Sequence, residues 1–245
     1  MVVKNKVVQT QQLIETGLCA WASWNDLGVI ARAELIGKWV DIISQEAALG
    51  KLAGEMAKYQ KHQAITLIGD EKLMPGPTGE VNELYSAGRG LFVVAATDAE
   101  QSSTINAIVG HISAALLAGN TLVLALPQAQ QALQFVLLNT LHAAGIPDLV
   151  VQGAEETELT ALIESPKVAG VAFTGDDKTA QTINRTLSTR DGLLAQLVAE
   201  VSGSALAYVT DTHFILRFIT ERTRTINITA VGGNATLLEL GGGDH

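Results

Sequence analysis

The sequence predicts a doubly wound α/β fold, in which a Rossmann-like, mostly parallel sheet is covered by helices on both faces. Two observations carry this prediction. Hydrophobic residues make up 47% of the chain and charged residues 17%, a balance that suits a sheet buried on both faces. From Asn82 onward, short apolar runs alternate with helix-like stretches, as they do in βαβ units with a parallel sheet.

The first part of the chain, residues 1–72, is predicted to be a helical lead-in that packs on the main domain. Apolar residues recur at helical spacing over residues 21–45, and a second helical stretch covers residues 47–63. Two prolines and two glycines within residues 73–80 then exclude both helix and strand. We therefore expect the clearest internal boundary at this point.

The α/β domain itself is expected over residues 73–211. Gly119 and Gly145 mark helix ends, and Asp176 is a good N-cap for the last helix of the series. The predicted strands are residues 90–97, 120–126, 148–152, 168–173, 194–200 and 205–209. The predicted helices are residues 100–118, 128–144, 155–164 and 176–190.

The last part, residues 212–245, does not continue this alternation. Residues 212–223 are a helix candidate with Asp211 as its cap, residues 224–229 have strand character, and residues 235–240 form an apolar terminal strand. A terminal strand must pair to satisfy its backbone groups. We therefore expect this tail to pair at an edge of another domain or subunit.

Charge and hydropathy exclude two classes of partner. Sixteen basic and 25 acidic residues give a net charge of −9, which disfavours binding to a phosphate backbone. The densest basic cluster, Arg217, Arg222 and Arg224, is interrupted by Glu221 and is predicted to be a solvated or salt-bridged helix face. The most apolar stretch, residues 105–126, is broken by polar residues, so no membrane insertion is expected.

Cysteine and histidine content argues against disulfides and metal sites. Cys19 is the only cysteine, and its apolar neighbours predict a small buried residue. The histidines at positions 62, 111, 142 and 213 show no ligand spacing; surface positions or hydrogen-bonded core positions account for them. The N-terminus has no apolar segment of a signal peptide, and a cytoplasmic location is the simplest expectation.

Four stretches resemble the dinucleotide-binding domain of aldehyde dehydrogenases, in the version found in proline utilization A (PutA) proteins. Their order and spacing make the resemblance specific. They are residues 73–82 (LMPGPTGEVN), residues 111–124 with the AGNT motif, residues 144–147 (AGIP) with 168–175 (VAGVAFTG), and residues 222–235, which are similar to the C-terminal motif of PutA proteins.

Departures from the family pattern shape the functional expectation. The resemblance implies a cofactor-binding lysine after the AGNT strand, where this chain has Ala125 and Leu126, and a phosphate-facing serine where it has Asp176. Glu200 stands at the family's general-base position. The nucleophilic cysteine belongs to a catalytic domain, for which the stretch between residues 208 and 224 leaves no room. We therefore treat Thr174, Gly175 and Glu200 as vestigial positions, with no catalytic residue and no metal.

The resemblance implies a non-catalytic structural or oligomerisation domain of a bifunctional proline dehydrogenase and 1-pyrroline-5-carboxylate dehydrogenase. Such a domain would stabilise the dehydrogenase module and help to seal its substrate channel. The parent protein would use FAD and NAD and could lie at the periphery of the inner membrane, whereas this domain is expected to bind neither cofactor.

The expected partner is the pyrroline-5-carboxylate dehydrogenase module of the same polypeptide, with no nucleic acid. The predicted contact residues are Arg222, Arg224, Ile226, Gly232, Gly233 and Asn234. Two alternatives stay open: an NAD-binding domain of an aldehyde dehydrogenase-like oxidoreductase, and a free-standing module that forms homo-oligomers through the tail.

Overall fold

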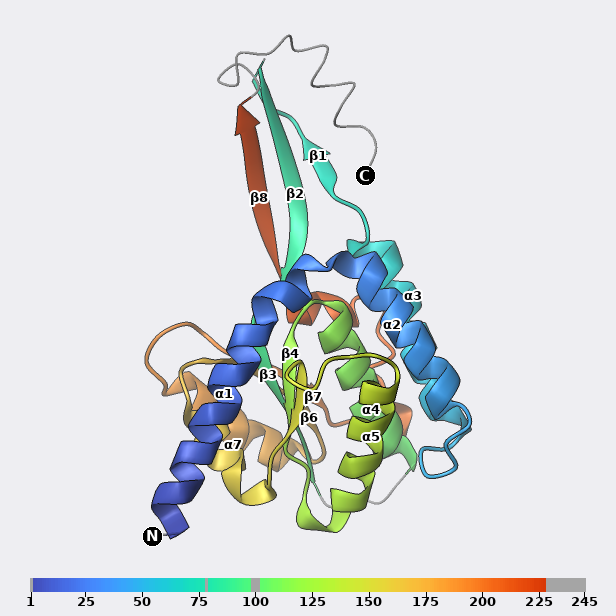
Figure 1. Ribbon diagram of the computed structural model, residues 1–245, viewed down its shortest axis with the longest axis vertical. Helices are drawn as coiled ribbons and strands as arrows, with labels where there is room; N and C mark the ends of the chain where they lie inside the picture. The colour runs from blue at the N-terminus through green and yellow to red at the C-terminus, as the bar shows by residue number, and fades with distance from the viewer. Residues whose placement is uncertain (1, 78, 98–101, 228–245) are drawn as a thin grey trace.

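The computed structural model describes residues 2–77, 79–97 and 102–227 and confirms the α/β fold (Figure 1). A five-stranded parallel sheet with the strand order β5-β4-β3-β6-β7 forms the centre of the body. A three-stranded antiparallel sheet, β1-β2-β8, projects from one end of this body (Figure 1). We call it the projecting sheet.

The helices and strands have the following bounds. The helices are α1 (Val2–Asp26), α2 (Gly28–Ile43), α3 (Lys51–Ile68), α4 (Ser102–Leu117), α5 (Gln131–Ala143), α6 (Leu159–Glu164) and α7 (Asp177–Ser188). The strands are β1 (Lys72–Met74), β2 (Glu80–Gly88), β3 (Leu91–Ala96), β4 (Thr121–Leu124), β5 (Val151–Gly153), β6 (Val168–Thr174), β7 (Gln196–Glu200) and β8 (Ile219–Asn227). Short 3-10 turns are η1 (Gln128–Gln130), η2 (Glu156–Glu158), η3 (Gly203–Ala205) and η4 (Phe214–Phe218).

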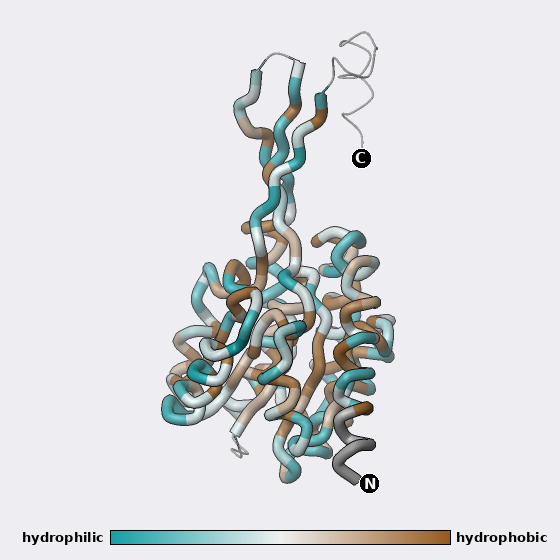
Figure 2. The backbone as a smooth tube through the Cα atoms, turned by 90° about the vertical axis from the view of Figure 1, so that its left-hand side faces the viewer, coloured by the Kyte–Doolittle hydropathy of each residue, from teal (hydrophilic) through white to brown (hydrophobic). Residues whose placement is uncertain are grey.

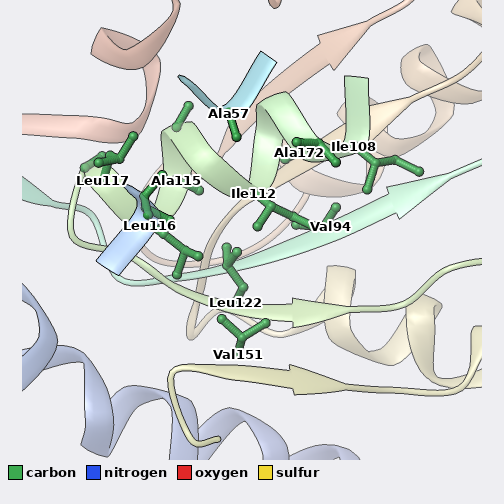
Figure 3. Packing of buried hydrophobic residues seen from close by; sticks show 14 of the residues in the cluster. Ala57, Val94, Ile108, Ile112, Ala115, Leu116, Leu117, Leu122, Val151 and Ala172 are labelled. Carbon is green, nitrogen blue, oxygen red and sulfur yellow. The ribbon is translucent and has the colours of Figure 1, made fainter. Parts of the chain in front are cut away.

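The two faces of the central sheet are buried by different helices. Because side chains alternate along a strand, Phe92 and Val94 of β3 face a core built with α2, α3, α4 and α5. Leu91 and Val93 of the same strand face a second core with α1, α6 and α7. Figure 3 shows α4 lying over the first face, with Ile112 near Val94. Burial of this apolar surface drives the assembly of the layers.

The N-terminal helical stretch turns at its middle. The expected single helix over residues 21–45 is wrong: α1 ends at Asp26 and α2 begins at Gly28, whose φ of 76° is readily adopted only by glycine. α1 also begins much earlier than expected. The turn sends α1 along one face of the sheet and α2 with α3 along the other, a change of direction that helical periodicity cannot report.

Three expectations are wrong, two in the projecting sheet and one in the segment that follows β7. Residues 73–80 are not free of strand, because β1 and the first residue of β2 lie there. The predicted helix over residues 212–223 is only the short turn η4, after which β8 pairs with β2 along nine residues. The β-branched residues of β8 favour this strand. The predicted strand over residues 205–209 is a turn, with Leu206 in the left-handed conformation at φ 50°.

Asn120 joins the two sheets. Its Oδ1 accepts hydrogen bonds from the backbone N–H groups of Arg89 and Gly90, between β2 and β3, at 2.7 and 3.1 Å. Its Nδ2 donates to the carbonyl of Ala115 in α4 at 3.0 Å and to that of Phe218, just before β8, at 2.9 Å. The side chain is fully buried, so one amide holds the end of β2 and the start of β8 at the base of the projecting sheet.

Arg32 joins two helix ends on the same side of the body. Its Nη1 donates to the carbonyls of Trp24 and Asn25 at the end of α1, at 3.1 and 2.6 Å, and its Nε donates to that of Leu117 at the end of α4, at 3.0 Å. A cation suits these carbonyl-rich C-termini. Arg32 is 1% exposed, and burial lowers the pKa of its guanidinium to about 10.

His111 and Cys19 depart from expectation. Cys19 is exposed and not buried, since it lies on the solvent side of α1. His111 in α4 is fully buried, and neither ring nitrogen has a hydrogen-bond partner among the described residues. Its ring packs instead against those of Phe214 and Phe218 in η4, with centroids 5.4 and 6.4 Å away. Burial lowers the pKa of the imidazole to about 4, an effect that the charge of Glu200 offsets only in part.

We predict that Asn120→Ala lowers the free energy of unfolding by about 3 kcal/mol, because the N–H groups of Arg89 and Gly90 and the carbonyl of Phe218 lose the side-chain amide as their partner. Urea unfolding of the full chain measures this loss. The control is Asn184→Ala, an exposed asparagine of α7. Equal stability of the two variants would contradict the role of Asn120.

His111 makes stability depend on pH. Its folded pKa of about 4 lies below the ordinary value of 6.5, so the unfolded chain takes up the proton first as the pH falls. Stability is then lost between about pH 6.5 and pH 4, with about 2 kcal/mol lost from pH 7 to pH 5.

The measurement is urea unfolding at pH 7 and pH 5. His111→Leu is expected to remove this share of the loss, whereas His62→Gln, a change at an exposed histidine of α3, keeps it. An unchanged pH 7 to pH 5 difference in His111→Leu would refute the assignment.

Candidate functional site

A cleft opens at the carboxyl edge of the central sheet. β3 connects to β4 on one side and lies next to β6 on the other, so this edge is a topological switch point, where α/β folds bind ligands. The cleft has a volume of about 230 Å³. It is lined by Thr97, Ser103, Thr104, Thr174, Gly175, Asp176, Glu200 and Gly203. The structure thus brings together Thr174, Gly175 and Glu200, the three positions named from the sequence.

Thr174 and Gly175 shape the floor of this cleft. The backbone N–H of Thr97 donates to the carbonyl of Thr174 at 3.0 Å, and that of Gly175 donates to the carbonyl of Glu200 at 3.1 Å. A Cβ atom at Gly175 would collide with the side chain of Thr97 and with the ring of Phe173, so only glycine fits there. The buried Thr174 hydroxyl has no hydrogen-bond partner within the described chain.

Glu200 is occupied by its own backbone. Its Oε1 accepts hydrogen bonds from the N–H and hydroxyl of Ser202 at 2.9 and 2.6 Å. Its Oε2 accepts from the N–H groups of Tyr208 and Val209, both at 2.9 Å. These four bonds use the acceptor sites of a carboxylate, and the side chain is 2% exposed. The carboxylate therefore holds the turn after β7, where a strand was expected.

Asp176 caps α7, as the sequence predicts. Its carboxylate accepts hydrogen bonds from the N–H and the hydroxyl of Thr179 at 2.9 and 2.7 Å. These bonds, first that from the hydroxyl, lower the pKa of Asp176 below its usual value. A helix N-terminus attracts anions through its free N–H groups. Here an internal carboxylate already takes that position.

The two residues after β4 do not line the cleft. Ala125 and Leu126 follow the AGNT strand and are 1% and 0% exposed. The N–H of Leu126 donates to the side chain of Gln134 in α5 at 2.9 Å. The pair therefore packs into the body and presents no charged group to a ligand.

Three of the predicted contact residues lie on one face of β8. Arg222 lies over the ring of Trp21 at 5.9 Å from its centroid. Arg224 donates to Glu83 of β2 at 2.7 Å and pairs with Glu71 at 3.2 Å, so the expected salt-bridged environment is found, on a strand and not on a helix. Ile226 is 43% exposed. Gly232, Gly233 and Asn234 lie outside the described residues.

Several lining residues were not foreseen. Thr97, Ser103 and Thr104 could have been found from their position after a predicted buried strand. The burial of His111 and Arg32 could not, because their neighbours come from distant segments. In the part of the chain that the structure describes, no three histidine, cysteine or acidic side chains gather as metal ligands. No helix there has the length and apolar character needed to cross a membrane.

Comparison with known proteins gives a consistent picture. The aldehyde dehydrogenase family model matches residues 103–221. N-succinylglutamate 5-semialdehyde dehydrogenase of Novosphingobium aromaticivorans is 37% identical over 107 residues, which cover 42% of this chain and 22% of that enzyme. The bifunctional protein PutA of Rhizobium meliloti is 28% identical over 207 residues, which cover 83% of this chain and 15% of that protein. The chain thus spans less than a quarter of either relative.

Solved structures agree with this result. A mutant of proline utilization A from Bradyrhizobium japonicum superimposes with a TM-score of 0.70 at 28% identity, over 80% of this chain and 22% of that one. A benzaldehyde dehydrogenase from Corynebacterium glutamicum, at a TM-score of 0.66 and 14% identity, shares the fold. Residues 103–221 thus match the aldehyde dehydrogenase family model, and the chain as a whole is similar to part of the PutA proteins.

Proposed function

We propose that this chain is a non-catalytic structural domain of a PutA-like protein, one that oxidises proline to glutamate with FAD and NAD. In this proposal the chain docks on the pyrroline-5-carboxylate dehydrogenase module of the same polypeptide, stabilises it and helps to seal its substrate channel. The observation that carries the proposal is the use of Glu200 and Asp176 as internal caps at the positions where the family binds and transforms its ligands.

The lining of the cleft argues against a bound dinucleotide. A pyrophosphate at the start of α7 would meet the carboxylate of Asp176 and would have to displace the capping bonds to Thr179. A general base needs an oxygen within reach of a proton, and both oxygens of Glu200 are engaged. Only 18 residues, 201–218, separate β7 from β8, too few for a catalytic domain.

The projecting sheet supports the docking role. Most of β8 is exposed, and β1 is exposed along its length. Apolar side chains near the far end of this sheet are open to solvent, with Leu73 77% and Ile226 43% exposed. Figure 2 shows hydrophilic residues interspersed with hydrophobic ones along this sheet. Edge strands with exposed apolar residues are typical of surfaces that pair with another polypeptide.

The first test is a calorimetric titration of the chain with NAD. We expect no saturable heat in the micromolar range, because no described group in the cleft compensates the pyrophosphate charge. A commercial aldehyde dehydrogenase serves as the positive control. Binding at micromolar affinity would overturn the non-catalytic assignment and favour the NAD-binding alternative.

The second test concerns docking through the projecting sheet. Ile226→Asp is expected to weaken association with the separately expressed pyrroline-5-carboxylate dehydrogenase module at least about tenfold, since a charge would be buried in an apolar contact. Association is measured by sedimentation velocity.

Leu194→Asp, at an exposed leucine of the loop before β7 with 90% exposure, is the matched control and should leave association unchanged. Equal effects of both variants, or self-association of the chain that Ile226→Asp abolishes, would contradict the proposed partner.

A further inference from the structure

A second cavity lies at the opposite edge of the central sheet, at the base of the projecting sheet. Its volume is about 320 Å³. It is bordered by the end of α1, the start of α2, the residues after α3, and the middle of β2 and β8. Its charged and polar lining includes Asp26, Arg32, Asp70, Glu71, Ser86 and Arg224.

Arg32 supplies a buried positive charge to this cavity. Its three hydrogen bonds all go to neutral carbonyls, and it forms no ion pair among the described residues. These bonds use Nε and Nη1. Nη2 has no hydrogen-bond acceptor among the described residues. Yet the residue is 1% exposed and lines the cavity. A buried cation without a counter-ion favours an anionic group beside it.

The rim of the cavity has the opposite charge. Asp26 and Asp70 are exposed and form no ion pair within the described chain, whereas Glu71 already pairs with Arg224. α1 and α3 also end here, at Asp26 and Ile68, and helix C-termini carry partial negative charge. The rim therefore favours a cationic group, whereas Arg32 favours an anionic group in the same cavity.

We propose that this cavity binds a small zwitterion of the α-amino acid class. The carboxylate would accept hydrogen bonds from Nη2 of Arg32, and the ammonium group would lie between Asp26 and Asp70. A simple anion would be repelled by the rim, and a simple cation would leave Arg32 without a counter-ion. This site is separate from the cleft, and it shares Arg224 with the surface proposed for docking.

The test uses the full chain and calorimetric titration with L-glutamine as the probe. N-acetyl-L-glutamine keeps only the carboxylate charge, and L-glutaminamide keeps only the ammonium charge. We expect each analogue to bind at least about tenfold more weakly than L-glutamine, because each loses one charge-assisted contact.

Asp70→Asn should weaken L-glutamine binding about tenfold and should not weaken N-acetyl-L-glutamine binding, because the anion loses a repulsive neighbour. Asp191→Asn, at an exposed aspartate of the loop after α7, is the matched control and should change neither. Absence of saturable L-glutamine binding would overturn the proposal. Binding of L-glutaminamide as tight as that of L-glutamine would reduce the site to a cation site and overturn the zwitterion assignment.

Discussion

The amide of Asn120 is the interaction on which the arrangement of the two sheets depends. It is the asparagine of the AGNT motif, and its four hydrogen bonds reach the entry to β3, the end of α4 and the residue before β8. Gly88 can lie against the backbone of Gly119 only because it has no side chain. The central sheet and the projecting sheet therefore share one buried joint, and their relative direction is fixed there.

The cleft shows how polar residues at the carboxyl edge of a parallel sheet can stabilise the fold itself. Glu200 and Asp176 are polar residues at the carboxyl edge, where α/β folds place their chemistry. Each has turned to nearby backbone donors, and each thereby stabilises a turn or a helix start. Buried polar groups must be paired, and the backbone N–H groups of Tyr208 and Val209 satisfy the buried carboxylate of Glu200.

Much of the central body could be predicted from the sequence, and the reasons are local. β3, β4 and β6 are continuous apolar runs that end at glycine or polar residues, and α4 and α5 follow them with clear stop signals at Gly119 and Gly145. β2 and the first part of β8 escaped prediction, and only residues 224–229 were given strand character. β2 is half-buried over most of its length and most of β8 is exposed, so no buried apolar face marks them. Their strand character comes from pairing with each other, although almost the entire α/β body lies between them in the sequence.

Long-range contacts also limited what could be predicted about the cleft and about His111. Thr174, Gly175 and Glu200 were identified through the resemblance to the family pattern and not through periodicity. The capping of Glu200 by Tyr208 and Val209 required a turn where the apolar run suggested a strand. The burial of His111 depends on Phe214 and Phe218, about a hundred residues later in the chain. Contacts of this range leave no periodic signal in a sequence.

The pairing of β2 with β8 has a consequence for the order of folding. Glu80 lies opposite Asn227, so the projecting sheet closes a loop that contains the whole parallel sheet. Contacts at such sequence separation form late, after the local units they enclose. The surface proposed for docking therefore exists only on chains whose body is already complete. A partner that recognises this sheet would bind folded domains and not unfolded chains, so unfolded chains would be left out of the assembly.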